Sequence, residues 1–347
     1  MPHTSLALMG FGNVGQALAR LLLEKQAELH SRYHITFAVT GIATGQHGTA
    51  IDHDGLNLQN ALAILSAGGS LDALSAGFDN SAGASSLSPL DFIRNCRADV
   101  LFESTPVNYQ SGQPAIDFLR AALEQGMHGI TANKGPVVHA YRELTELAKA
   151  KGRRFYFESA VMDGAPIFSL FRETLPAVRL HAFRGILNST TNLILTRMEN
   201  GESFEQAVAY AQAIGIAETD PGGDLDGWDA AVKVAALVTV LMGIPIEPQE
   251  VSREGIRHIT SLEIAHAQRQ GKRWKLVCTA RREGENLVAR VAPEMVGIAS
   301  PLYGVEGTSS MIQFETDVLP SLAIVESDPG PRTTAYGMLA DFINAVS

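Results

Sequence analysis

Cysteine is scarce in this sequence, and basic residues are outnumbered by acidic ones. The 347 residues include only two cysteines, Cys96 and Cys278, and their separation matches no metal-binding spacing. Two distant cysteines argue against a disulfide framework and fit the reducing cytoplasm. The 27 Lys and Arg against 37 Asp and Glu give a net charge of −10, and no basic cluster is present. Nucleic acids and anionic membranes are therefore not expected as partners.

The sequence also lacks the features of a targeting or membrane segment. No basic segment followed by an apolar run and a cleavage site stands at the N-terminus, so no signal peptide is predicted. The longest apolar stretch, 230–246, is shorter than a membrane span and contains Lys233. Hydrophobic residues make up 46% of the chain and charged residues 18%. This composition supports a large core, in two domains or one elaborate one.

A dinucleotide-binding motif is predicted at the start of the chain. The apolar run 5–9 predicts a buried strand, and leucines at helical spacing predict a helix over 16–29. Between them lies a G-x-G-x-x-G pattern made of Gly10, Phe11, Gly12, Asn13, Val14 and Gly15. Strand, glycine motif and helix in this order place a pyrophosphate on backbone N–H groups at the helix N-terminus. A glycine-rich turn without a ligand is the alternative.

The chain continues with alternating strand and helix patterns, which are typical of a doubly wound α/β sheet. Further strands are predicted at 34–43, 100–103, 129–132 and 154–158. Ligands of such sheets bind beyond the carboxyl ends of the strands, where Ser104, Thr105 and Lys134 follow. For Ser104 and Thr105, capping of a helix is an equally good interpretation. For Lys134 the alternative is an ordinary surface lysine.

The loop after the second predicted strand does not discriminate between the two nicotinamide cofactors. A carboxylate there would bind the ribose 2′-hydroxyl of NAD, and an arginine would bind the 2′-phosphate of NADP. The sequence instead has Thr44, Gly45, Gln46, His47 and Gly48. Thr44 is the candidate contact to the cofactor, and both NAD and NADP stay open. The histidine and the backbone amides could hold a phosphate, and a solvated loop without a ligand explains the segment equally well.

The stretch 217–237 carries the strongest sign of chemistry. It begins as an acidic, glycine-rich loop and continues as a predicted helix over 228–241, whose only charged residues are Asp229 and Lys233. The two are four apart and therefore lie on one face. Because the other faces are apolar, the helix should be buried, and a buried lysine needs a partner. We interpret the pair as part of a site. An ordinary surface ion pair is the alternative.

Glu158 opens another candidate site, the loop 158–166 with the sequence ESAVMDGAP. A carboxylate followed by small residues in a tight loop can bind a hard cation through its side chain and backbone carbonyls. An anchoring role for Glu158 in the loop explains the pattern equally well. The rest of the chain predicts helices at 167–175, 193–200, 204–214 and 333–345, a polar turn at 188–192, and antiparallel strands after residue 272.

In this order the motifs resemble homoserine dehydrogenase over essentially the whole chain. The matching segments are GFGNVG at 10–15, ESTP at 103–106, TANKGPV at 131–137, ESAVMDGAPIF at 158–168, GILNSTTNLIL at 185–195 and AETDPGGDLDGWDAAVK at 217–233. The last segment is the most specific and the first the least. With the patterns above, the resemblance implies an NAD(P)-binding Rossmann-type domain at 1–157 and an α+β substrate-binding and dimerisation domain at 158–330. A final helix within 331–347 is expected to return to the first domain.

The resemblance also implies the activity and the roles of individual residues. The reaction would be the reversible NAD(P)-dependent interconversion of L-homoserine and L-aspartate 4-semialdehyde in threonine, methionine and isoleucine biosynthesis, catalysed by a homodimer. The implied catalytic residues are Lys233, Lys134 and Asp229, and the implied substrate contacts are Glu218, Asp224, Thr190 and Ser189. A sodium site is implied at Glu158 and the carbonyls of Val161, Asp163 and Ala165, although Asp163 departs from the small residues usual there. No segment matching the family's regulatory domain follows the final helix, so threonine feedback through such a domain is not expected.

Two other functions fit parts of the sequence. One is an oxidoreductase on the same scaffold that acts on a different amino acid or semialdehyde. The other is a nucleotide-sensing regulator without catalysis, which would not need two lysines together with Glu218 and Asp229. An acylating semialdehyde dehydrogenase would need a nucleophilic cysteine, and neither Cys96 nor Cys278 is well placed for that role.

Overall fold

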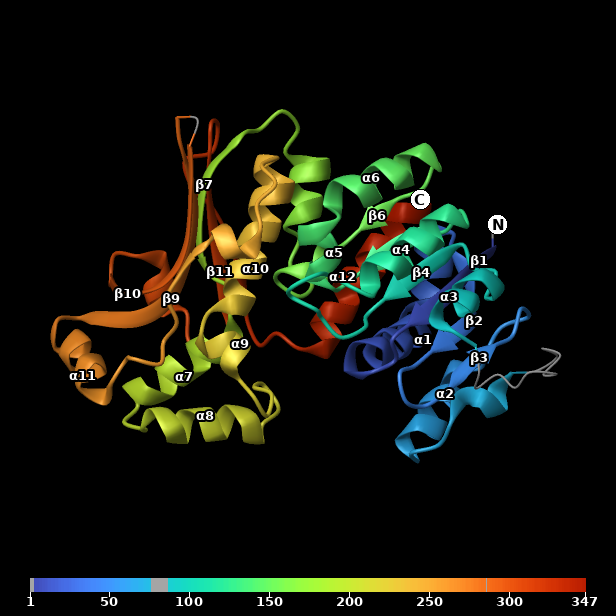
Figure 1. The fold of residues 1–347 in the computed structure, drawn as a ribbon, viewed down its shortest axis with the longest axis horizontal. Helices are drawn as coiled ribbons and strands as arrows, with labels where there is room; N and C mark the ends of the chain where they lie inside the picture. The colour runs from blue at the N-terminus through green and yellow to red at the C-terminus, as the bar shows by residue number, and fades with distance from the viewer. Residues whose placement is uncertain (1–2, 76–86, 285) are drawn as a thin grey trace. The chain divides into compact units, whose positions relative to one another are not determined.

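The computed structural model describes residues 3–75, 87–284 and 286–347. The chain divides into two compact units, Met1–Pro166 with Gly330–Ser347 and Ile167–Pro329 (Figure 1). The serine- and glycine-rich segment 75–88, expected as a loop, lies mostly outside the described residues.

The first unit is a doubly wound sheet, as the sequence predicts. Its strands are β1 (His3–Met9), β2 (Thr36–Ala43), β3 (Thr49–Ile51), β4 (Val100–Glu103), β5 (His128–Thr131) and β6 (Phe155–Tyr156). They lie in the order β3-β2-β1-β4-β5-β6. The five strands β2, β1, β4, β5 and β6 are parallel, and β3 at the edge is antiparallel to β2. The order reverses between β1 and β4, and dinucleotides bind at the carboxyl edge of such a reversal.

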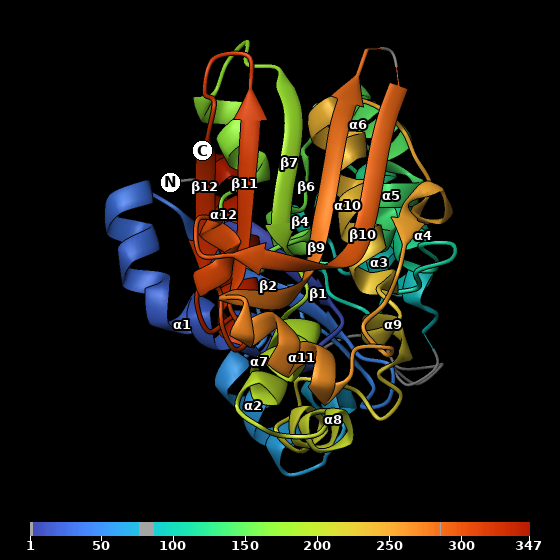
Figure 2. The ribbon, with the colours of Figure 1, turned by 90° about the vertical axis from the view of Figure 1, so that its left-hand side faces the viewer.

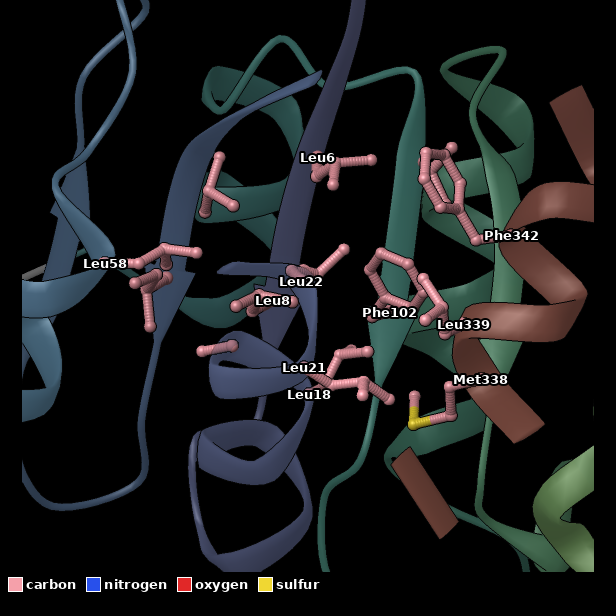
Figure 3. Packing of buried hydrophobic residues seen from close by; sticks show 14 of the residues in the cluster. Leu6, Leu8, Leu18, Leu21, Leu22, Leu58, Phe102, Met338, Leu339 and Phe342 are labelled. Atoms are coloured by element: carbon pink, nitrogen blue, oxygen red, sulfur yellow. The ribbon is translucent and has the colours of Figure 1, made fainter. Parts of the chain in front are cut away.

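Helices pack on both faces of this sheet. They are α1 (Asn13–Tyr33), α2 (Leu58–Ser66), α3 (Pro89–Asn95), α4 (Ala115–Glu124), α5 (Lys134–His139), α6 (Tyr141–Ala150) and α12 (Pro331–Val346). α1, α2 and α12 form one core with the sheet, and α3 and α4 form another on the opposite face. Figure 3 shows Leu8 and Phe102 of the sheet near Leu18 of α1 and Phe342 of α12. The rings of Phe102 and Phe342 meet edge to face with centroids 5.8 Å apart, so the C-terminal helix completes the core of the first unit.

The second unit is an antiparallel sheet with one short parallel edge strand. Its strands are β7 (Leu180–Ile186), β8 (Ser252–Arg253), β9 (Lys272–Glu283), β10 (Asn286–Gly297), β11 (Ser310–Thr316) and β12 (Leu322–Glu326), in the order β12-β11-β7-β9-β10-β8. Its helices are α7 (Ser189–Glu199), α8 (Phe204–Ala213), α9 (Gly222–Leu225), α10 (Trp228–Leu237) and α11 (Ser261–Arg269). α10 packs against β9 and β10, and Figure 2 shows it behind the long strands.

Two helix starts differ from the sequence-based expectation. α7 begins at Ser189, within the predicted polar turn, because Asn188 caps it and its Oδ1 accepts the N–H of Thr191 at 2.8 Å. Similarly, the sequence predicts a helix only from 138 to 151, whereas α5 begins directly at Lys134, where Asn133 is the cap. In both cases a polar residue after a buried strand starts a helix instead of extending a loop.

Two predicted helices are shorter or less regular than expected. The segment 167–175 is helical over 168–174, and its last five residues, Leu170–Thr174, form a π-helical stretch. The helix predicted over 228–241 ends as α-helix at Leu237 and continues as a π-helical stretch, Val238–Met242. No helix of the described chain is long and apolar enough to cross a membrane.

Candidate active site

The glycine motif makes the turn from β1 into α1. Gly10 has a φ of +91°, and a Cβ on it would lie 2.6 Å from the carbonyl oxygen of Ser104. A Cβ on Gly15 would lie 2.5 Å from the carbonyl oxygen of Gly10, whereas one on Gly12 would meet no atom within 4 Å. Gly10 and Gly15 are therefore required by packing, while Gly12 leaves the backbone open to a ligand. This is the arrangement that binds a pyrophosphate at a helix N-terminus.

The other residues of the motif follow from this turn. Phe11 is buried and Val14 half-buried, while Asn13 is exposed at the first position of α1. Ser104 lies beside the turn, because its N–H donates to the carbonyl of Met9 at 2.8 Å and its hydroxyl donates to that of Gly10 at 3.1 Å.

Thr105 and Thr44 use their hydroxyl groups locally. Both the N–H and the hydroxyl of Thr105 donate to the carboxylate of Glu103. The next helix of the described chain begins only at Ala115, so neither Ser104 nor Thr105 is a helix cap, and that alternative is wrong. The hydroxyl of Thr44 donates to the carbonyl of Gly48 at 2.9 Å, which closes the loop after β2.

Lys134 is the first residue of α5, beyond the carboxyl end of β5. It is half-buried, and its Nζ lies 5.8 Å from the centroid of the Tyr109 ring. A contact of this length is within the range of a cation–π interaction. The lysine therefore has a defined environment within the first unit.

Asp229 and Lys233 form a buried ion pair on α10. Their side chains are only 10% and 15% exposed, and Nζ lies 3.2 Å from Oδ2 of Asp229. Nζ also donates to the carbonyl oxygen of Leu187 at 2.6 Å. The interpretation as an ordinary surface pair is therefore wrong. Burying two charged groups costs desolvation free energy, and buried ion pairs that are kept despite this cost are typical of functional sites.

Asn188 joins this pair to the acidic loop. Its Nδ2 donates to Oδ1 of Asp224 at 2.7 Å and to Oδ2 of Asp229 at 3.0 Å. Burial and the neighbouring charge of Asp229 raise the pKa of Asp224, and the hydrogen bonds from Asn188 and Thr190 oppose that rise. Two carboxylates (−2) and the single ammonium of Lys233 (+1) leave this cluster with a formal charge of −1. A further cation would therefore be bound favourably here.

Of the remaining predicted substrate contacts in the described chain, only Thr190 interacts with this cluster, through Asp224. Thr190 is buried, and its hydroxyl also donates to the carbonyl of Ile216 at 3.3 Å. Ser189 is half-buried at the start of α7. Glu218 is exposed in the loop that leads to α9. The second unit thus links Asp224 and Asp229 through Asn188, with Thr190 beside Asp224 and Lys233 paired with Asp229.

Comparison with known proteins decides the family. Residues 166–343 match the model of the family described as homoserine dehydrogenase. The chain belongs to the homoserine dehydrogenase family. Residues 10–158 match the model described as the NAD-binding domain of homoserine dehydrogenase, so the chain carries a domain for a nicotinamide cofactor.

Some relatives match this family member over nearly their full length. The NAD(+)-dependent homoserine dehydrogenase of Pseudomonas canavaninivorans is 32% identical, covering 99% of this chain and 96% of the relative. The homoserine dehydrogenase of Methanocaldococcus jannaschii is 36% identical, covering 98% and 97%. The structure of a hyperthermophilic archaeal homoserine dehydrogenase in complex with NADPH superposes with a TM-score of 0.82 at 28% identity, covering 99% of this chain and 98% of the other.

In this homoserine dehydrogenase family member, Asn188 was not singled out from the sequence. It stands in a polar run whose residues are individually unremarkable, and its two carboxylate partners lie 36 and 41 positions away. Its position directly after a buried strand, facing an acidic loop, is the one signal that could have indicated it. Glu103 was also not singled out. It is an acidic residue at the end of the apolar strand β4, and its partner Thr131 lies 28 positions away.

The loop proposed for sodium packs against the C-terminal helix. Glu158 is buried, and its N–H donates to Oδ2 of Asp341 at 2.7 Å. The carboxylate of Asp163 accepts the hydroxyl of Thr334 at 2.8 Å, so its side chain is directed at the first turn of α12. Within the described chain no three His, Cys, Asp or Glu side chains cluster as metal ligands. A site built mainly from backbone carbonyls does not require such a cluster.

A second buried lysine stabilises α7 from the side of β9. Lys275 is 0% exposed, and its Nζ donates to Oδ1 of Asn192 at 3.0 Å and to the carbonyl of Val305 at 2.6 Å. Burial lowers the pKa of Lys275 to about 8, from 10.5. Between these two pH values the unfolded chain binds more protons than the folded chain, so raising the pH favours folding.

Comparing the wild-type protein with Lys275→Met should reveal this proton linkage. From pH 8 to 10 the unfolding free energy of the wild type should rise relative to that of the variant, by at most roughly 3 kcal/mol. Urea unfolding can be followed by tryptophan fluorescence, because both tryptophans, Trp228 and Trp274, lie in the second unit. If the unfolding free energies of the wild type and of Lys275→Met instead change in parallel between pH 8 and 10, Lys275 is not the titrating group.

Proposed function

We propose that this chain catalyses the reversible NAD(P)-dependent interconversion of L-homoserine and L-aspartate 4-semialdehyde. The observation that carries the proposal is the buried cluster of Asp224, Asn188, Asp229 and Lys233. Its charge of −1 suits the ammonium group of an amino acid, and its lysine suits proton exchange with a hydroxyl group. The assignment of homoserine to this site follows from the relatives, whose names give that activity.

In the reduction direction Lys233 acts as the acid. Its ammonium, paired with Asp229, donates a proton to the aldehyde oxygen while the carbonyl carbon receives a hydride, and homoserine results. The bound nicotinamide supplies that hydride. Asp229 holds the ammonium in place, and Asp224 with Glu218 binds the substrate amino group. Thr190 and Ser189 line the start of α7 beside this cluster.

Lys134 is the second catalytic lysine in this proposal. It lies at the N-terminus of α5 in the first unit, and its proposed role is to supply positive charge that stabilises negative charge on the reacting oxygen. Gly10, Gly12 and Gly15 with the start of α1 bind the cofactor pyrophosphate, and Ser104 and Thr105 contact the nicotinamide half.

The reverse reaction tests this proposal by its product. Aspartate semialdehyde and NADH or NADPH should be consumed in equal amounts, and amino-acid analysis should detect homoserine. A product other than homoserine would favour a different substrate on the same scaffold. Cofactor binding without turnover of homoserine or aspartate semialdehyde would favour a nucleotide sensor.

We further propose that NAD is preferred over NADP. No lysine or arginine occurs between Arg32 and Arg94, a stretch that includes β2 and the loop Thr44–Gly48 after it. The 2′-phosphate of NADP needs a cation at this point of the fold, whereas the 2′-hydroxyl of NAD does not. The relative from Pseudomonas canavaninivorans, named as NAD(+)-dependent, agrees with this preference.

Introducing a cation should shift the preference. Gly45 is exposed and a Cβ on it would meet no atom within 4 Å, so a long side chain fits. Gly45→Arg should raise the ratio of kcat/KM for NADP to that for NAD by about tenfold or more. Gly45→Met adds similar bulk without charge and should leave the ratio near its wild-type value. An equal shift in both variants would contradict a role for the missing cation.

A sodium ion is proposed at Glu158 and the carbonyls of Val161, Asp163 and Ala165. The loop is buried and its backbone is fixed against α12 through Ser159, whose hydroxyl donates to the carbonyl of Thr334 at 2.6 Å. Exchanging sodium for a bulky organic cation should lower both activity and the thermal midpoint, since a bound ion stabilises the folded loop. If neither value changes, the cation site is not at Glu158.

A homodimer is proposed through the face of the second unit's sheet opposite α10. In Figure 2 α10 lies behind the long strands, and the opposite face of the sheet is turned toward the viewer. Val288 and Val325 are 47% and 60% exposed there. The same face carries the ion pairs Arg184–Glu294 and Arg281–Glu315. A mixture of exposed hydrophobic and charged side chains is compatible with a subunit interface. Light scattering should give twice the chain mass of 37.1 kDa, and a mass equal to one chain would contradict the proposal.

A further inference from the structure

Glu103 is a fully buried carboxylate in the first unit. It is the last residue of β4 and is 0% exposed. Its Oε1 accepts the N–H of Thr105 at 2.7 Å and the hydroxyl of the same residue, and its Oε2 accepts the hydroxyl of Thr131. Burial raises the pKa of Glu103, and these hydrogen bonds oppose the rise. Among the described residues, no lysine or arginine forms an ion pair with it.

The hydrogen bonds around Glu103 have a fixed direction. Because the hydroxyl of Thr131 donates to Glu103, its oxygen is free to accept the N–H of Asn133, at 2.9 Å. Oδ1 of Asn133 in turn accepts the N–H of Gly135 at 2.9 Å and caps α5. Nδ2 of Asn133 reaches back to the carbonyl of Thr105 at 3.4 Å. The hydroxyl of Thr131 and the N–H groups of Asn133 and Gly135 thus all point along the chain toward the carboxylate.

This chain of bonds connects two segments that carry site residues. One is the end of β4 with Ser104 and Thr105, and the other is the start of α5 with Lys134. Burying a carboxylate without a cation costs free energy of folding. Neutral groups would therefore stabilise a purely structural link better than a carboxylate does. A carboxylate does, however, fix the direction of all its hydrogen bonds, because it can only accept.

We propose that Glu103 is a positioning residue, whose carboxylate holds Thr105 and the N-terminus of α5, and through them Lys134, in the orientation used for catalysis. The inference rests on the proposed function in so far as Lys134 belongs to the active site. The position of Lys134 can be measured without activity, so the two ideas fail separately.

Glu103→Gln tests the direction of the bonds with little change of shape. The glutamine amide nitrogen cannot accept, so either the hydroxyl of Thr131 or the groups of Thr105 lose their acceptor. We expect kcat to fall about tenfold or more, because small displacements of a site residue have effects of this size. The KM for homoserine, which binds the second unit, should stay within about twofold by the same argument.

Thr131 provides a matched pair of variants. Thr131→Val has the same shape but no hydroxyl, and it should reproduce the loss of kcat seen with Glu103→Gln. Thr131→Ser keeps the hydroxyl and should recover much of that loss. A purely structural role would instead make the loss of kcat follow the loss of thermal stability across the three variants.

Acylation of lysines, read by mass spectrometry, gives the measurement that does not need turnover. In Glu103→Gln the labelling rate of Lys134 should change severalfold relative to the exposed Lys149 of α6, which serves as the internal reference. An unchanged rate at Lys134 together with an unchanged kcat would overturn the proposal. A wild-type protein inactive on homoserine, with the labelling change still present, would refute the function and leave the positioning role standing.

Discussion

Lys233→Met should lower kcat for homoserine oxidation by about 10²–10⁴-fold, because it removes the group that exchanges the hydroxyl proton. The structure supports this role, since Nζ is paired with Asp229 at 3.2 Å and held by the carbonyl of Leu187 at 2.6 Å. Binding of NAD should be unchanged, because the glycine motif lies in the first unit. Cofactor affinity can be measured by titrating NADH fluorescence, and kcat by absorbance at saturating substrate.

Two controls separate catalysis from folding in this experiment. Lys272→Met changes another lysine of the second unit that is outside the cluster, and it should keep near wild-type turnover. Lys233→Met leaves the carboxylate of Asp229 without its cation, which costs stability. The double variant Lys233→Met with Asp229→Asn removes both charges and should regain stability without regaining kcat. Normal turnover by Lys233→Met would exclude this lysine from the mechanism.

Asn188→Asp should destabilise the second unit by about 2–4 kcal/mol, although it only replaces the side-chain amide nitrogen with an oxygen. The amide nitrogen that donates to Asp224 and Asp229 becomes a third oxygen facing both carboxylates. The capping bond to the N–H of Thr191 is kept, because an aspartate oxygen accepts it equally well. Tryptophan fluorescence during urea unfolding reports the effect, since Trp228 and Trp274 both lie in this unit.

Exchanging the two residues provides the corresponding rescue. In Asn188→Asp combined with Asp224→Asn, the amide now at position 224 can donate to the carboxylate now at position 188, which removes one of the two repulsive contacts, so part of the lost stability should return. A double variant as unstable as the sum of its single variants would show that the bridge is not what stabilises the cluster.

The nucleotide-binding unit could be predicted well because its signals are local. The run 5–9, the glycines that follow and the leucines of α1 together indicate strand, turn and helix within one short segment. The reversal of strand order between β1 and β4 follows from the rules of such sheets. The short antiparallel strand β3 was not expected, since three residues carry too little pattern to be distinguished from a loop.

The charged pair of the second unit was predictable for a different reason. Asp229 and Lys233 interrupt a helix that is otherwise apolar, and such an exception is visible in the sequence alone. The residues that organise the site were not visible in this way. Asn188 and Glu103 act through partners far along the chain, and Asn192 meets Lys275 across 83 positions. Long-range hydrogen bonds of this kind leave no periodic pattern.

The polar run 188–192 shows how the same residues can be read in two ways. Asparagine, serine and threonine favour turns, so a turn was expected there. The same residue types also cap helices, and in the structure Asn188 caps α7 while Thr190 and Thr191 are buried in its first turn. Whether such a run forms a turn or a capped helix depends on whether tertiary partners bury its polar groups.

Reduction of NAD by the purified protein in the presence of L-homoserine tests the central claim most directly. We predict homoserine-dependent growth of the absorbance of reduced nicotinamide, faster with NAD than with NADP, and absent when 4-hydroxybutanoate replaces homoserine because the amino group is missing. No increase with either cofactor, under conditions where binding of NADH is observed, would contradict the proposed activity.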